Sequence, residues 1–489
     1  MRQSLSKLVL AALVLAMVSG MAYGGGRSEP ASSGSAASGV AVKPAKISLM
    51  ASTMIPDPAN NQEAITAAYE KMTGIKLEFI KPAHNEYNQR VDLAFASGDL
   101  PDAFEAVPKY AIFAANGALW DATDAFYASP ISKRSHVYVA DTIKVGGRLY
   151  GIPGAHGNGC ITYVRRDWLD KLGLKMPTNW NEFYNMLVAF RDKDPDGDGI
   201  KNTIPFITAG VVDPMYLRDF YYGENTQPGF FIKNGKIVDG MYDPDFKAGL
   251  TRLAQAYKEG LVDQESVTNT TAGARDKFYT GKVGVFTYWA GQWNQNLQSN
   301  LEKTVPTAIV EAMPPIQGTV LIDRPAASTL CIPSANKNPL GIFKYLAEVA
   351  YDGGEGQMLF IHGVEGVHWK REGNVYSRLP DAVNPQQLFE KVFVNPTICM
   401  YEWDDPIKDQ EDLMVSLNLF NKNAKPSFTL PSSEDITSIQ TELETARQEI
   451  VSKIVMGVLS VDEGLAQYKN QYDADVQQCL KIMNDLYSK

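Results

Sequence analysis

Cysteine and histidine are scarce in this chain, and their scarcity excludes several kinds of site. The 489 residues include only four cysteines and five histidines. Cys160, Cys331, Cys399 and Cys479 lie far apart, so the chain has no CxxC motif for a metal or a redox reaction. An even number of cysteines permits disulfides without requiring them, and we expect buried free thiols. The histidines form no HExxH motif, which leaves a zinc hydrolase without support.

Positive charge is also in short supply. The chain has 46 Lys and Arg residues against 56 Asp and Glu residues, for a formal net charge of -10. Nucleic-acid-binding proteins gather Lys and Arg on one face, and this sequence has no such basic cluster. We therefore expect no nucleic-acid partner. The length of 489 residues is too great for one ordinary core and favours two or more lobes.

Long hydrophobic runs are absent beyond the N-terminus. The first residues, MRQSLSK, carry two positive charges, LVLAALVLAMV is an apolar run, and Ala22 and Gly24 are small residues suited to a cleavage site. We interpret residues 1–24 as a signal peptide. A membrane anchor is the alternative, but the run is short for a span and Gly and Ser follow it. Because the first cysteine is Cys160, no lipobox cysteine is seen, and we expect a soluble periplasmic or extracellular protein.

The chain then alternates between strand and helix patterns. Residues 25–44 are rich in Gly, Ser, Ala and Pro and predict a flexible leader. Residues 46–50, 75–82 and 100–107 have strand patterns, and helical spacing separates them. This order predicts a parallel sheet of α/β type, in which a ligand lies beyond the carboxyl ends of the strands.

The same alternation begins again in the middle of the chain. GRLYGIPG and GCITYVRR have strand patterns, residues 243–262 are helical, and KVGVFTYWAG is a further strand. A later strand and helix indicate a return to the first lobe. We predict an N-terminal lobe of residues 45–158 plus 320–376 and a C-terminal lobe of residues 159–319 plus 377–489. The last part is helical, and Ser432 and Asp435 have capping-box spacing at its start.

Seven short sequence segments, or phrases, follow one another along the chain in a characteristic order. Together they resemble the extracellular solute-binding proteins of ABC importers, in particular the carbohydrate-binding group that includes the alginate-oligosaccharide- and maltose-type proteins. The phrases are ASGDLPDAFEA, GRLYGIPG, YVRRDWLDKLGLKMPTNWNEF, YKEGLVD, FYTGKVGVFTYWAGQW, HGVEGVHW and VMGVLSVDEGLAQY. The resemblance implies the large type II periplasmic-binding-protein fold, with two α/β lobes, a ligand cleft between them and a helical C-terminal region. It also implies a monomer that closes around a sugar and delivers it to permease subunits.

The segment DKDPDGDGIKNTIPF contains alternating aspartates followed by glycine. In alginate-binding members a calcium site lies at this place, so the resemblance implies as ligands Asp194, Asp196, Asp198, the carbonyl of Ile200 and Asn202. This chain has Asn202 and Thr203 where the family usually has Asp-Glu, so calcium should bind weakly. A structural calcium clip and a metal-free Asx-rich turn both remain open. A calcium switch is disfavoured, because the loop leads into a strand and not into a second helix.

Sugar sites combine flat aromatic rings with planar polar side chains, and several candidates follow predicted strands. The competing interpretations are core packing for the aromatic residues, a helix N-cap for Glu105, a structural role for His156 and a surface arginine beside Arg166 for Arg165. The candidates are Tyr288, Trp289 and Trp293 after one strand, Glu105 and His156 in the first lobe, Asp213 and Tyr216 after IPFITAG, Tyr401, Glu402 and Trp403 in MYEWDD, and Arg165 for a uronate carboxylate.

Two other functions compete with a sugar receptor. A secreted glycoside hydrolase needs two carboxylates across the scissile bond, and Glu105 and Glu402 could supply them. Nothing in the sequence marks either residue as an acid or a nucleophile, and the chain has no GxSxG motif or P-loop. We therefore expect no enzymatic activity. A receptor for a peptide or another solute is the second alternative.

Overall fold

The structure is a computed structural model that describes residues 40–56, 61–156, 158–221, 226–325, 329–379, 399–407 and 411–488. The predicted signal peptide and most of the predicted leader lie outside these residues. Among the helices of the described ranges, none combines the length and the apolar character that a membrane span requires.

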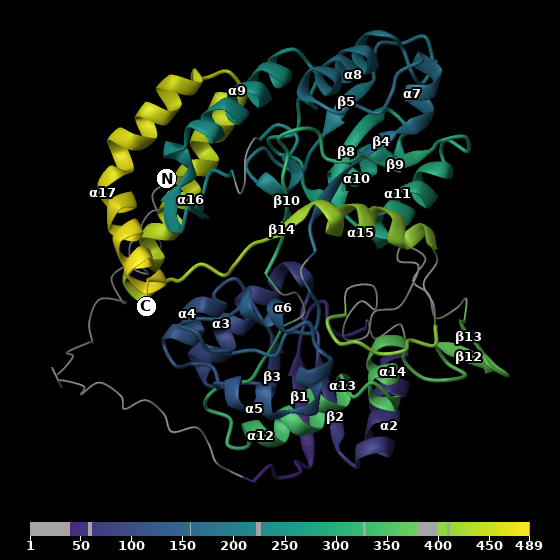
Figure 1. Cartoon of the computed structure of the whole chain (residues 1–489), viewed down its shortest axis with the longest axis vertical. Coiled ribbons are helices and arrows are strands. Elements are labelled where there is room, and N and C mark those ends of the chain that lie inside the picture. The colour runs from purple at the N-terminus through teal and green to yellow at the C-terminus, as the bar shows by residue number, and fades with distance from the viewer. Residues whose placement is uncertain are drawn as a thin grey trace, which may run out of the picture. The chain divides into compact units, whose positions relative to one another are not determined.

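The first sheet has four strands in the order β11-β3-β1-β2 (Figure 1). Strand β1 pairs in parallel with β2 and β3, as the alternation of strands and helices predicts, whereas β11 is antiparallel to β3. The expectation of a purely parallel sheet is therefore wrong for its edge strand, because that strand runs in the direction opposite to β3. The strands are β1 (Lys46–Met50), β2 (Lys76–Ile80), β3 (Ala103–Glu105) and β11 (Leu330–Cys331).

The helices around this sheet begin and end largely where the sequence indicates. Helix α2 ends at Gly74 and α3 at Gly98, both with positive φ, which glycine adopts without steric cost. GRLYGIPG is not a strand: it contributes two isolated bridges, one between Arg148 and Val145 and one between Ile152 and Leu330. The helical segments are α2 (Gln62–Thr73), η2 (His84–Glu86), α3 (Tyr87–Ser97), α4 (Tyr110–Ala115), α5 (Thr123–Ala128), η3 (Pro130–Arg134), α6 (Val137–Asp141), α12 (Pro339–Ile342), η6 (Phe343–Ala347), α13 (Glu348–Ala350) and α14 (Glu355–His362).

The second sheet also has four strands, in the order β5-β8-β4-β9. Strand β8 is parallel to β5 and antiparallel to β4, so its backbone is hydrogen-bonded on both sides. The register places Trp289 opposite Cys160 and Tyr288 opposite Ile161. The elements of this part are β4 (Cys160–Arg165), α7 (Arg166–Leu172), α8 (Trp180–Asp192), β5 (Ile204–Ile207), η4 (Pro214–Tyr216), α9 (Pro244–Lys258), α10 (Thr271–Tyr279), β8 (Val283–Trp289), α11 (Gln292–Glu302) and β9 (Val310–Ala312).

Three two-stranded sheets complete the strands of the described ranges. Two of them are antiparallel hairpins, β6 (Phe230–Lys233) with β7 (Lys236–Asp239) and β12 (Trp369–Glu372) with β13 (Val375–Arg378). The other is a parallel pair, β10 (Leu321–Asp323) with β14 (Ala424–Pro426), whose strands are about a hundred residues apart in the chain. Helix α15 (Glu411–Asn423) leads into β14.

The C-terminal region is helical, as predicted, and α16 and α17 lie beside each other and beside α9 (Figure 1). Helix α16 (Glu434–Val455) buries Ile436, Leu443, Ile450 and Ile454 at helical spacing. The predicted capping box at its start is absent, because the N-cap is Ser433 and its side chain makes no capping hydrogen bond. A capping box occurs instead at Ser460 and Glu463, where α17 (Val461–Tyr487) begins.

The side chains on the two faces of the second sheet belong to two different hydrophobic clusters. Tyr163 and Phe286 join a cluster that also contains the first sheet, whereas their neighbours Val164 and Val285 join a cluster with the C-terminal helices. Successive side chains of a strand point to opposite faces, so both faces of this sheet are covered. The predicted boundaries of the two lobes stay a prediction.

The C-terminal helices are anchored by a buried carboxylate. Asp239 Oδ2 accepts hydrogen bonds from Arg447 Nη2 at 2.6 Å and from the Tyr468 hydroxyl at 2.9 Å, and its side chain has no exposed surface. Asp239 Oδ1 accepts from the backbone N–H of Met241 at 2.9 Å. These hydrogen bonds join strand β7 to α16 and α17. The buried Asp239 carboxylate depends on them, and on the Arg447 cation in particular, to offset the cost of its burial.

We predict that Arg447→Ala lowers the free energy of unfolding by about 3 to 5 kcal/mol, because it leaves Asp239 buried without its cation. Urea unfolding of the purified protein measures this value. The matched control is Lys453→Ala on the same helix, which removes an exposed pair with Glu449 and should cost less than about 0.5 kcal/mol. Equal losses for the two variants would contradict the anchor.

Candidate ligand-binding site

Aromatic side chains gather where strand β8 ends. Tyr288 and Trp289 are its last two residues, Gly291 turns the chain at φ +80, and Trp293 lies in the first turn of α11. Tyr288 is buried, whereas Trp289 and Trp293 are half-buried. The Trp293 ring contacts Tyr288 edge-on, with ring centroids 4.9 Å apart. The buried strand thus holds two partly exposed indoles at its carboxyl end.

Two arginines lie against these indoles. The guanidinium of Arg275 is 4.8 Å from the Trp293 centroid, and its Nη1 donates to the Tyr288 hydroxyl at 2.9 Å. The guanidinium of Arg324 is 5.3 Å from the Trp289 centroid. Both distances are within the range of cation–π attraction. Within the described ranges no carboxylate forms an ion pair with either arginine, so most of their N–H donors are available to a ligand.

Asp213 and Tyr216 belong to the same cluster. The Tyr216 ring stacks on Tyr288 with centroids 6.2 Å apart, and Asp213 caps η4 by accepting from the N–H of Met215. Burial raises the pKa of the Asp213 carboxyl, and the nearby Arg324 opposes that shift. Burial also raises the pKa of Tyr288, against the effect of Arg275. The structure therefore brings together five predicted residues: Tyr288, Trp289, Trp293, Asp213 and Tyr216.

Glu105 performs a structural task in this conformation. Its Oε2 accepts from the backbone N–H groups of Ser52 and Thr53, each at 2.9 Å, and the Thr53 hydroxyl donates to Oε1. The carboxylate thus fixes the segment that follows β1. His156 lies next to Ala155, which forms an isolated bridge with Cys399. A ligand role for Glu105 and His156 stays a prediction.

The three MYEWDD residues have different surroundings. Tyr401 is buried, stacks on Tyr351 with centroids 4.2 Å apart and donates to the carbonyl of Pro153, which favours core packing. Glu402 is largely exposed, with its carboxylate 3.9 Å from His136. Trp403 stacks on His362, whose Nε2 lies 2.9 Å from both carboxylate oxygens of Asp405. Their common role in a ligand site stays a prediction.

Arg165 is engaged by groups of the protein itself, and its predicted role toward a uronate carboxylate stays a prediction. Its side chain is only 2% exposed, and its guanidinium pairs with Asp167 at 2.6 Å. It also donates to the carbonyl of Gly281 and lies over the Trp168 ring. Sequence reasoning chose Arg165 and missed Arg275 and Arg324, because no local pattern reveals which guanidinium reaches an exposed indole.

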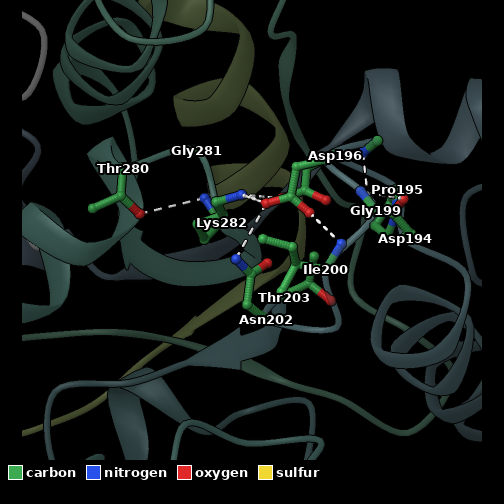
Figure 2. Close-up of polar contacts among 12 residues, drawn as sticks. Asp194, Pro195, Asp196, Gly199, Ile200, Asn202, Thr203, Thr280, Gly281 and Lys282 are labelled. Carbon is green, nitrogen blue, oxygen red and sulfur yellow. Dashed lines mark hydrogen bonds and ion pairs between the residues drawn. The ribbon is translucent and has the colours of Figure 1, made fainter.

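The aspartate loop lies at the other end of strand β8 (Figure 2). Asp194, Asp196 and Asp198 each offer a carboxylate oxygen, and these oxygens lie within 4.8 Å of one another. Lys282, the residue before β8, places its Nζ 2.6 Å from Asp196 and pairs with Asp198 as well. Hydrogen bonds to these two carboxylates raise the pKa of Lys282, and the pair with Lys282 lowers that of Asp198.

The remaining predicted ligands make contacts of their own. The Ile200 carbonyl accepts from the N–H of Asn202 at 3.0 Å, and the Asn202 amide nitrogen donates to Asp198 at 3.2 Å. Thr203, which stands where the family usually has an acidic residue, donates its hydroxyl to the carbonyl of Phe190. Calcium takes six to eight oxygens in a flexible shell. This donor set, with an ammonium group against it, does not fit that requirement.

A cavity of about 470 Å³ borders the loop. Its lining includes the loop residues Asp196 and Asp198 and the cations Lys171, Lys282 and Arg165. All three cations already contact carboxylate or carbonyl oxygens of the protein, so their positive charges are balanced without a ligand in the cavity. We assign it no ligand.

Comparison with known proteins identifies the family. Residues 52–354 match the bacterial extracellular solute-binding proteins. This match covers more than half of the chain, and the chain belongs to this family. It also agrees with the resemblance that the sequence phrases carry.

Two curated relatives cover part of the chain. Lipoprotein LipO of Bacillus subtilis is 27% identical over 267 residues, which is 53% of this chain and 52% of LipO. The fructooligosaccharide ABC transporter substrate-binding protein FusA of Streptococcus pneumoniae is 25% identical over 264 residues, or 49% of each chain. The chain thus spans about half the length of the curated relatives that it matches.

Solved structures confirm the fold class. FusA in complex with kestose aligns with a TM-score of 0.69 at 20% identity, over 91% of this chain and 99% of FusA. The alginate-binding protein AlgQ2 without calcium ion aligns with a TM-score of 0.69 at 23% identity, over 91% of this chain and 98% of AlgQ2. The chain therefore has the two-lobed α/β fold of solute-binding proteins, with a helical C-terminal region.

We predict that Asp323→Asn changes how stability depends on pH. Burial raises the pKa of the Asp323 carboxyl from 3.8 to about 6, and its Oδ1 has no hydrogen-bond partner within the described part of the chain. The folded state thus holds this proton more tightly than the unfolded state does. Its contribution to stability is present below about pH 4 and is lost as the pH rises through about 6.

Urea unfolding at several pH values checks this prediction. Relative to the wild type, Asp323→Asn should gain roughly 2 kcal/mol between about pH 4 and pH 7. Asp219, whose pKa burial also raises to about 6, is common to both proteins and cancels in the difference. Parallel stability curves for the two proteins would refute the assignment.

Proposed function

We propose that this protein is an exported receptor that captures a carbohydrate and delivers it to the permease subunits of an ABC importer. The observation that carries this proposal is the cluster at the end of β8, where two half-buried indoles lie beside two arginines that form no ion pair with a carboxylate of the described residues. The indoles suit the apolar face of a sugar ring, and the guanidinium groups suit its oxygen atoms. The solute-binding family to which the chain belongs supports the same function, and so does the relative FusA, a fructooligosaccharide ABC transporter substrate-binding protein.

Further parts of the proposal follow from the sequence. The predicted signal peptide supports export to the periplasm or the outer surface, and the predicted lobes support closure around the ligand. Closure requires that the ligand binds the closed form more tightly than the open form, and a transporter can then recognise the closed form. We propose a monomer that binds the sugar without cleaving it, so that a bound oligosaccharide is recovered intact.

The first experiment is a thermal-shift screen of the purified protein with neutral oligosaccharides, uronate oligosaccharides and peptides. A saturable rise in melting temperature with one sugar class supports the proposal, because a ligand that binds only the folded state stabilises it. A rise with peptides alone would favour a peptide receptor. Conversion of the sugar to smaller products would favour a glycoside hydrolase.

We predict that Trp289→Ala weakens binding of the sugar identified in the screen by about tenfold or more, because it removes a central aromatic contact. Isothermal titration calorimetry measures the affinity. Trp180→Ala is the matched control, since Trp180 is also half-buried and lies 5.1 Å from a guanidinium, that of Arg252. The control should change stability and leave affinity within about twofold of the wild type. Equal losses of affinity in both variants would contradict the site.

We also predict that Arg324→Gln separates two ligand classes. If the sugar is a uronate, the variant binds it more weakly at low ionic strength, and the difference shrinks as salt is added, because salt screens an exposed charge pair. If the sugar is neutral, the loss does not depend on salt. Calorimetry at two ionic strengths distinguishes the cases. Unchanged affinity under both conditions would place Arg324 outside the site.

A further inference from the structure

The aspartate loop is built around an internal cation. Lys282 precedes β8, and its backbone is held on both sides: its carbonyl accepts from the N–H of Ile204 at 2.8 Å and its N–H donates to the Thr280 hydroxyl at 3.3 Å. The strand therefore directs the lysine side chain at the loop (Figure 2), where its Nζ bonds both Asp196 and Asp198. An ammonium group has three donors, so it can serve two carboxylates at once.

The other carboxylate oxygens of the loop are also engaged. Asp194 accepts from the N–H of Gly197 at 3.1 Å and from that of Gly199 at 3.0 Å. Both glycines have positive φ, a backbone conformation that other residues rarely adopt. Asp198 Oδ1 accepts from the N–H of Ile200 at 2.7 Å. The exception within the described ranges is Asp196 Oδ1, which lacks a hydrogen-bond partner. The Lys282 ammonium occupies the other oxygen of Asp196 and one oxygen of Asp198, which leaves the loop short of the six to eight oxygens that calcium takes.

The charge balance of the loop agrees with its hydrogen bonds. Two of the three carboxylates contact the Lys282 ammonium, and Lys171 Nζ donates to the carbonyl of Pro195 at 2.9 Å, which adds a second positive charge. The Asp196 side chain is only 11% exposed, and that of Lys282 is 32% exposed. A partly buried pair of this kind is screened less by solvent than a surface pair.

We propose that the Lys282 ammonium takes the place of a calcium ion in this loop, so that the loop keeps its form without metal. The proposal concerns the stability of the protein and is independent of its ligand. It explains why the chain has no acidic residue at Thr203: with an internal cation supplied by β8, a further carboxylate is not needed. Thr203 instead donates to the carbonyl of Phe190 and joins the loop to α8.

The first test uses the wild-type protein. Its melting temperature is measured in EDTA and in about 10 mM CaCl₂, which exceeds the dissociation constants typical of extracellular calcium modules. We expect a difference below about 1 °C. A larger rise with calcium would overturn the proposal, because it would show that the folded protein binds the ion in preference to the unfolded chain.

The second test removes the ammonium. Lys282→Met keeps the length and apolar stem of the side chain and should lower the melting temperature by about 2 °C or more in EDTA. Lys201→Gln is the matched control, because Lys201 is on the same loop but makes none of these contacts, and Lys282→Arg keeps the charge. Both should stay within about 1 °C of the wild type. If Lys282→Met were no less stable than Lys201→Gln, the proposal would fail.

The third test restores a metal ligand set. Lys282→Met combined with Thr203→Glu removes the ammonium and returns an acidic residue to the loop. We expect the melting temperature of this double variant to rise by about 2 °C or more in 10 mM CaCl₂, while the wild type stays unchanged. A wild type that responds to calcium as strongly as the double variant would refute the substitution of lysine for calcium.

Discussion

The fixed position of strand β8 determines where the residues at both ends of the second sheet lie. Every residue from Val283 to Tyr288 is buried, and the backbone pairs with β4 on one side and β5 on the other. A buried backbone must satisfy its hydrogen bonds, so the strand cannot slide or rotate without losing two ladders. Lys282 and Trp289 therefore lie at defined positions at its two ends, roughly 20 Å apart at the usual rise per residue.

The two ends use this rigidity differently. At the carboxyl end, the strand presents Trp289 and supports Trp293, and the arginines that contact them come from α10 and from the segment after β10. In the proposed receptor, these side chains are in place before a ligand arrives, which reduces the entropy lost on binding. At the amino end, the strand delivers a lysine to a loop of aspartates. The same backbone thus supports the proposed ligand site at one end and the aspartate loop at the other.

Much of the fold was predictable because its signals are local. The predicted strand at residues 46–50 coincides with β1, and Gly74 and Gly98 end helices as expected. The errors have a common cause. GRLYGIPG alternates like a strand but forms only isolated bridges, and β11 pairs antiparallel with β3 although the other strands of its sheet are parallel. The local sequence pattern indicates which secondary structure a segment favours, whereas the strand it pairs with decides the structure it adopts.

By itself, the sequence determined the family, the α/β class, the helical C-terminal region and the positions of the aromatic and acidic motifs. These properties follow from periodicity and from contiguous phrases, which need no knowledge of distant contacts. Only the tertiary structure decided which charges meet. It buried Arg165 against Asp167, brought Arg275 and Arg324 to the indoles and placed Lys282 among the aspartates. Lys282 and Asp196 are 86 positions apart, and only the pairing of β5 with β8 brings them together.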